Sequence, residues 1–112
     1  MTIKFNGKDY EVSLTIGGVK IYCKEMGCSL MQFSSNIQKL DVDAVQTLLY
    51  AGMVGACQKA KTTPDFTMEE VKNEIDGWDF NRLQELITTF TGMLNEGLAK
   101  NDQASPKEAV QN

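Results

Sequence analysis

Apolar and polar residues alternate at the start of the chain with the two-residue period of a β-strand. The apolar members of this pattern are Ile3, Phe5, Tyr10, Val12 and Leu14. Between the two halves lies Asn6-Gly7, a pair that accepts the positive φ angles of a tight hairpin turn, although Lys8-Asp9 could also belong to the turn. Because an isolated hairpin is only marginally stable, we expect its apolar face to pack on helices.

From residue 15 onward the apolar residues recur every three or four positions, which is the spacing of one face of a helix. This spacing predicts five helices, over about residues 15–26, 29–40, 42–61, 67–76 and 79–98. Residues that can cap the helix starts are Ser29, Asp41 or Asp43, Thr67 with Glu70, and Asp79. Gly27 and Gly77 lie where helices are expected to end. The pair Gly17-Gly18 weakens the first turn of the first helix, so its start at Thr15 competes with a later start at Gly18 or Val19.

The predicted third helix carries small residues beside its apolar face. They are Ala51, Gly52, Gly55 and Ala56. Small side chains let another backbone approach a helix closely, for a steric reason that holds in water as well as in membranes. Whether that backbone belongs to this chain or to another is open at this point.

The complete pattern predicts an α+β fold in which an N-terminal β-hairpin packs on a cluster of about five α-helices. We expect residues 1–100 to form a single domain, which is an ordinary length for an independently folding unit. Residues 101–112 contain Gln, Ser, Pro and mixed charges with one large apolar residue, and this composition predicts a disordered C-terminal tail.

The net charge and the cysteines indicate which classes of partner are excluded and which cellular compartment to expect. The net charge is −4 and Arg82 is the single arginine, so the clustered basic face of a nucleic-acid binder is missing. No apolar run approaches the length of about 18–20 residues that a membrane span needs, and no secretory signal opens the chain. The three cysteines, Cys23, Cys28 and Cys57, form no CxxC pair and are typical of free thiols in a reducing compartment. We therefore expect a soluble protein of the cytoplasm.

The chain offers little that could carry catalysis. It contains no histidine, which excludes Ser-His and Cys-His nucleophiles and a Cys-His zinc site. Helix caps and a solvated face account for the acidic cluster, whose spacing does not match a calcium-binding loop. Its members are Glu69, Glu70, Glu74, Asp76 and Asp79. Gly17-Gly18 matches no phosphate-binding pattern. We expect no catalytic residue, no cofactor and no metal, and therefore no enzyme.

Large aromatic residues stand at both ends of the predicted fourth helix: Phe66 before it, and Trp78 and Phe80 after it. Such residues are either staples that fasten a short helix to a core or anchors in an interface with another protein. The same two alternatives apply to Tyr50, which lies off the main apolar stripe of the third helix. With Met53, whose side chain can adapt to a partner, these residues are the candidates for a partner-binding surface.

Five stretches of sequence, taken in order, resemble the tail assembly chaperones of long-tailed bacteriophages. They are TIKFNGKDYEVSLTIGG, YCKEMGCSL, DVDAVQTLLYAGMVGAC, FTMEEVKNEIDGW and FNRLQELITTFTGMLNEGL, and they span about residues 2–99. No single stretch is specific to the family; the order of the set carries the resemblance.

The resemblance implies a non-enzymatic helper in the cytoplasm of a bacterial host. Such a protein binds the tape-measure protein, keeps it soluble, helps to recruit tail-tube subunits and is absent from the finished tail. Apolar grooves among the third to fifth helices would then shield the tape-measure chain. Family members are often made in two lengths by ribosomal frameshifting. The alternative is a small cytoplasmic adaptor or regulator that binds one globular partner. Self-association is open under both interpretations.

Overall fold

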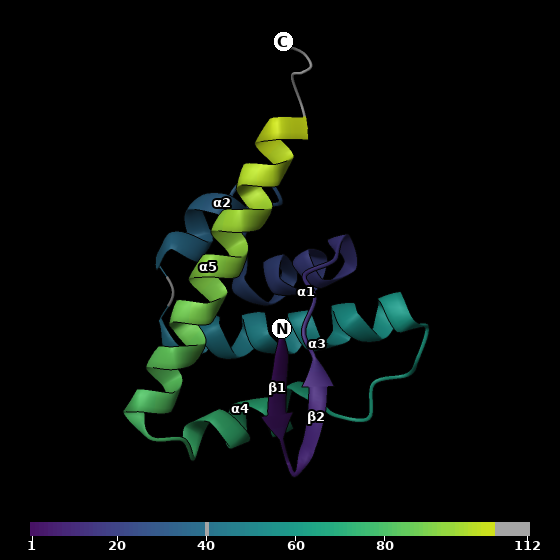
Figure 1. Cartoon of the computed structure of the whole chain (residues 1–112), viewed down its shortest axis with the longest axis vertical. Coiled ribbons are helices and arrows are strands. Elements are labelled where there is room, and N and C mark those ends of the chain that lie inside the picture. The colour runs from purple at the N-terminus through teal and green to yellow at the C-terminus, as the bar shows by residue number, and fades with distance from the viewer. Residues whose placement is uncertain (40, 105–112) are drawn as a thin grey trace. The chain divides into compact units, whose positions relative to one another are not determined.

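The computed structural model describes residues 1–39 and 41–104, with side chains as far as residue 92. Two compact units make up the chain, Met1–Gly77 and Trp78–Asn112, and each is described by itself. The fold is α+β: a two-stranded antiparallel hairpin is followed by five helices, as the sequence pattern predicts (Figure 1). The expectation of a single domain over residues 1–100 stays a prediction.

The hairpin is built from β1 (Thr2–Phe5) and β2 (Lys8–Glu11). Ile3 pairs with Tyr10 and Phe5 with Lys8, so the connection is the two-residue turn Asn6-Gly7. Both turn residues have positive φ angles, 54° and 78°, as a tight hairpin turn requires. The longer turn through Lys8-Asp9 is therefore excluded. The alternation is also confirmed, since Ile3 and Phe5 are buried while their polar neighbours are exposed.

The helices are α1 (Ile16–Met26), α2 (Phe33–Asn36), α3 (Val42–Ala60), α4 (Met68–Asp76) and α5 (Phe80–Ala104). A short 3-10 helix, η1 (Ile37–Lys39), continues α2. Three predicted caps are confirmed by their hydrogen bonds. Asp41 Oδ1 accepts from the Ala44 N–H at 2.8 Å, Thr67 and Glu70 form a capping box, and Asp79 Oδ1 accepts from the Arg82 N–H at 2.9 Å.

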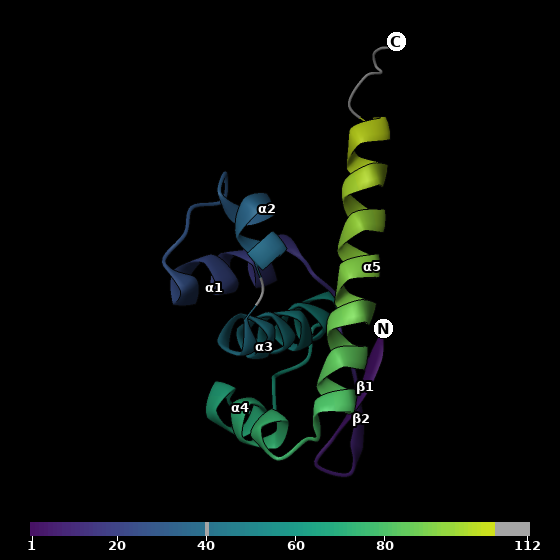
Figure 2. The ribbon, with the colours of Figure 1, turned by 90° about the vertical axis from the view of Figure 1, so that its left-hand side faces the viewer.

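Helix α3 is the centre of the first unit. It lies between α1 and α4 in both views of the ribbon (Figures 1 and 2). Its side chains are buried on almost every side from residue 44 to residue 55, which explains why its sequence has no polar stripe. The largest fully buried side chains of this unit are Tyr22, Leu48, Leu49, Met53, Val45 and Val71.

The small residues of α3 receive a backbone from the same chain. The segment that joins β2 to α1 crosses α3 at Gly52 and Gly55, where the Ser13 N–H donates to the Gly52 carbonyl at 2.9 Å. A β-carbon on Gly55 would lie 2.3 Å from the Ser13 carbonyl oxygen, and one on Gly18 would lie 2.7 Å from the Ala51 carbonyl oxygen. At Ala51, Gly52 and Gly55 the approaching backbone therefore belongs to this chain, to α1 and the segment that leads into it.

Helix α1 begins close to Thr15, the first of the two expected starts, and not at Gly18 or Val19. Its first residue is Ile16 and its N-cap is Thr15, whose Oγ1 accepts from the Gly18 N–H at 3.0 Å. Gly17 and Gly18 weaken a helix in isolation, but here the cap and the close approach to α3 outweigh that weakness. A start at Gly18 or Val19 is therefore wrong.

Helix α2 begins later than predicted, at Phe33 instead of just after Ser29. Ser29 and Gln32 exchange two hydrogen bonds, of 2.9 and 3.2 Å, which close a turn before the helix. Leu30 and Met31 consequently stand outside any helix, and their side chains are 59% and 92% exposed. The predicted end of this helix, residue 40, lies outside the described residues.

Helix α5 continues to Ala104 and so includes four residues of the segment for which composition predicts a disordered tail. The remainder of that segment, residues 105–112, lies outside the described residues, so the predicted tail stays a prediction there.

Candidate functional site

Four aromatic rings join the hairpin to α3 and to the segment before α4. Tyr10 lies edge-on to Phe5 and to Phe66, with ring centroids 5.4 Å apart in both pairs. Tyr50 lies edge-on to Phe66 at 5.9 Å. Such edge-to-face pairs stabilise a packed cluster beyond the burial of their area. Phe66 is 6% exposed, so its ring is packed inside the unit.

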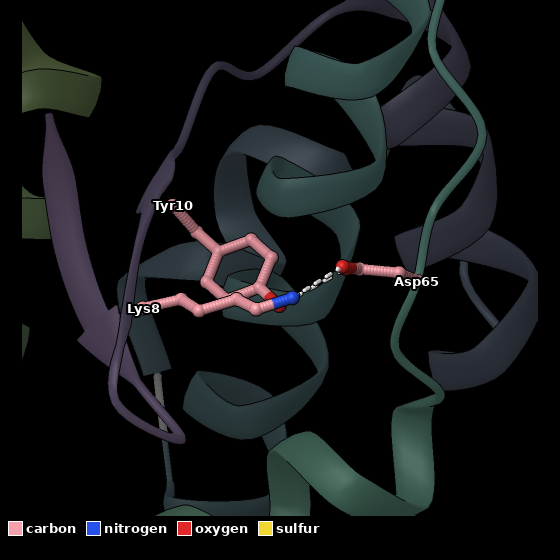
Figure 3. Close-up of polar contacts among 3 residues, drawn as sticks. All are labelled: Lys8, Tyr10 and Asp65. Carbon is pink, nitrogen blue, oxygen red and sulfur yellow. Dashed lines mark hydrogen bonds and ion pairs between the residues drawn. The ribbon is translucent and has the colours of Figure 1, made fainter.

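Tyr10, one member of this aromatic cluster, also takes part in a polar contact with Lys8 and Asp65 (Figure 3). Asp65 accepts a hydrogen bond from the Tyr10 hydroxyl at 3.0 Å and pairs with the Lys8 ammonium at 3.2 Å. The hydrogen bond from Tyr10, followed by the one from Lys8, lowers the pKa of Asp65, and Asp65 in turn raises the pKa of Lys8. Because Lys8 and Asp65 are more than half exposed, water screens their attraction and the pair adds little stability. The contact joins β2 to the segment that precedes α4.

The structure brings two of the five candidate partner-binding residues together, Tyr50 and Phe66. Tyr50 is half-buried, and Met53 is only 1% exposed and inaccessible without a rearrangement of α3. Trp78 and Phe80 belong to the second unit, where the Arg82 guanidinium lies 4.0 Å from the centre of the Trp78 ring and Phe80 is 72% exposed. The role of these five residues in binding a partner stays a prediction.

Sequence reasoning missed that large apolar side chains around α1 and the segment after it are exposed. Ile16, Leu30 and Met31 are more than half exposed there. Between α1 and Leu30 lies a shallow depression of about 540 Å³, which we call the α1 groove. Its lining includes Gly17, Lys20, Ile21, Lys24, Leu30 and Gln58. The sequence did contain a signal for this exposure. Leu30 and Met31 are adjacent and follow the helix end at Gly27 closely, and a short turn cannot bury two adjacent large side chains.

The buried polar groups near this groove have structural partners. The Tyr22 hydroxyl donates to Asn36 Oδ1, and burial raises the pKa of Tyr22 to about 12. The Cys23 thiol donates to the Ser29 carbonyl at 3.5 Å, and burial, followed by the neighbouring Cys28, raises the pKa of Cys23 to about 11. These bonds fasten α1 to the residues that follow it, and a thiol with a raised pKa is a weak nucleophile.

Three of the acidic residues around α4 also have structural partners. Glu70 completes the capping box, Asp79 caps α5, and Asp76 accepts from the buried Gln46 amide at 2.7 Å. Within the described part of the chain, no three His, Cys, Asp or Glu side chains gather closely enough to hold a metal ion. In the same part of the chain, no helix combines the length and the apolar character that crossing a membrane demands.

Comparison with known proteins adds no relative. No protein-family model matches the sequence, no curated protein matches it, and no solved structure matches the fold.

Proposed function

We propose that this chain is a tail assembly chaperone of a long-tailed bacteriophage. In this role it binds the tape-measure protein in the cytoplasm of the host, keeps it soluble and helps to recruit tail-tube subunits. The observation that carries the proposal is the ordered set of five motifs over about residues 2–99, which resembles that family.

The surface of the first unit is consistent with this role. A chaperone for a long helical protein needs exposed apolar side chains that can cover apolar stripes of its client. Leu30 and Met31 supply such side chains next to the α1 groove, and Ile16 supplies another at the start of α1. Since part of the small-residue face of α3 is filled by the chain itself, we place client binding at the α1 groove and not in the grooves among the third to fifth helices that the sequence suggested.

Co-expression tests the proposal directly. The tape-measure protein encoded nearest to this chain's gene is produced alone and together with this chain, and its soluble fraction is measured after lysis. The proposal predicts that the tape-measure protein becomes soluble and co-purifies with several copies of this chain. If the tape-measure protein stays insoluble in both cases, or if no such gene lies nearby, the proposal is wrong.

Stoichiometry separates the chaperone from a small adaptor that binds one globular partner. A chaperone that lines a long client binds in many copies along it, whereas an adaptor binds its partner one to one. Light scattering of the purified complex distinguishes the two results.

A further inference from the structure

The α1 groove combines an apolar floor with a rim of hydrogen-bond donors. One face of α1 supplies Gly17, Lys20, Ile21 and Lys24, since residues three, four and seven positions apart share a helix face. Leu30 forms the apolar wall on the other side. A partner that fills this groove must therefore bring apolar side chains to its centre.

Gln58 of α3 supplies the first donor of the rim. Its Oε1 accepts from the Thr15 hydroxyl at 2.9 Å, and that hydroxyl in turn accepts from the Gly18 N–H. The amide is held there because Gly17 has no side chain: a β-carbon on Gly17 would lie 2.3 Å from Gln58 Oε1. With Oε1 engaged, Nε2 remains as a donor that no residue in the described ranges accepts from.

Lys20 and Lys24 supply the charge. Neither ammonium forms an ion pair with any residue of the described part of the chain. They stand four residues apart on α1, so their positions are separated by about one helical turn, or about 6 Å. The nearest acid on the helix, Glu25, is about 100° around the axis from Lys24 and does not line the groove. In a chain whose net charge is −4, this rim is a local positive site.

We propose that the α1 groove binds an amphipathic helix that carries a pair of acidic residues three or four positions apart along one edge of its apolar stripe. Acidic side chains at that spacing match the separation of Lys20 and Lys24, while the apolar stripe covers Ile21 and Leu30. This inference rests on the proposed function, under which the helix is a segment of the tape-measure protein.

The test uses the full chain and peptides of about 20 residues that tile the tape-measure protein, each with a fluorescent label. Fluorescence anisotropy gives the dissociation constant of each peptide. The proposal predicts that the peptides that bind have an apolar helical stripe edged by an acidic pair. Changing both acidic residues of such a peptide to Lys should weaken its binding at least about tenfold.

Substitutions in the chain locate the binding surface. Leu30→Asp should weaken binding at least about tenfold, because it places a charge against the apolar stripe. Lys24→Glu should weaken it about three- to tenfold near 50 mM salt and less near 500 mM, because salt screens exposed charges. The matched controls are Val42→Asp, at the start of α3, and Lys72→Glu, on α4. They place the same charges in a depression between α3 and α4, and α4 lies on the other side of α3 from α1 (Figures 1 and 2). Circular dichroism confirms that each variant is folded.

The outcomes separate this inference from the proposed function. If the unaltered chain binds neither the peptides nor the intact tape-measure protein, the proposed function fails and the inference fails with it. If the chain binds but Leu30→Asp and Lys24→Glu bind as well as their controls, the inference alone is overturned. If the chain by itself forms oligomers that Leu30→Asp converts to monomers, the occupant of the groove is a second copy and the inference is also overturned.

Discussion

Replacing Gly55 by Ala tests how the first unit is held together. Inside a helix an alanine is more favourable than a glycine by about 1 kcal/mol, so helix propensity alone predicts a more stable protein. The structure predicts the opposite, since the new β-carbon would lie 2.3 Å from the Ser13 carbonyl oxygen and 2.9 Å from Thr15 Oγ1. Both atoms belong to the short segment before α1, which must move by about 1 Å to restore an ordinary contact.

The magnitude follows from what that movement disturbs. Overpacking of this kind costs about 1–3 kcal/mol. The movement also strains the hydrogen bond of 2.9 Å from the Ser13 N–H to the Gly52 carbonyl, which is worth about 1 kcal/mol. It disturbs the Thr15 cap as well, worth about 1 kcal/mol more. After the gain in helix propensity, Gly55→Ala should lower the free energy of unfolding by about 2–4 kcal/mol.

Urea denaturation followed by far-UV circular dichroism measures this change. The unfolding midpoint should fall by roughly 1–2 M, given the slopes usual for small domains. Gly92→Ala is the matched control, because no atom lies within 4 Å of a β-carbon built there. It should leave stability unchanged or raise it by up to about 1 kcal/mol. If Gly55→Ala is as stable as Gly92→Ala, that result contradicts the close approach of Ser13 and Thr15 to Gly55 of α3.

Three further predictions follow from the described contacts. Burial raises the pKa of Tyr22 to about 12, so the folded state keeps a proton that the unfolded state loses near pH 10. The free energy of unfolding should therefore fall as the pH rises from about 10 to about 12. Urea titrations across this range measure the fall, and Tyr22→Phe should flatten it. Because burial raises the pKa of Cys23 to about 11, this thiol should react with a disulfide reagent at pH 8 more slowly than Cys28 and Cys57. Mass spectrometry of partly labelled protein identifies which thiol has reacted. Equal rates for the three thiols would contradict the burial of Cys23. Thr67→Ala removes one half of the capping box and should lower the free energy of unfolding by about 1 kcal/mol, whereas Thr67→Ser should preserve it.

Much of this fold could be predicted from the sequence because it depends on local signals. The positive φ angles of the hairpin turn need only Asn6-Gly7, and the capping box needs only Thr67 and Glu70, three residues apart. Such interactions form between neighbours in the chain and leave a pattern that can be recognised without a tertiary structure.

The start of α1 and the candidate site depend on contacts between distant parts of the chain. Gly17 and Gly18 look like helix breakers until α3 is placed against them, since their value lies in the space they leave for Gln58 and Ala51. The α1 groove also joins α1 to Gln58, more than thirty residues away in the sequence. Helical periodicity placed Leu30 in a helix over residues 29–40, whereas α2 begins at Phe33 and leaves Leu30 in an exposed turn before it.

The measurement that tests the central claim most directly is the soluble fraction of the tape-measure protein co-expressed with the unaltered chain, with Leu30→Asp or with Val42→Asp. The account predicts that the unaltered chain and Val42→Asp both bring the tape-measure protein into the soluble fraction, while Leu30→Asp, folded but altered in the α1 groove, leaves most of it insoluble. Insoluble tape-measure protein in all three cases would contradict the account.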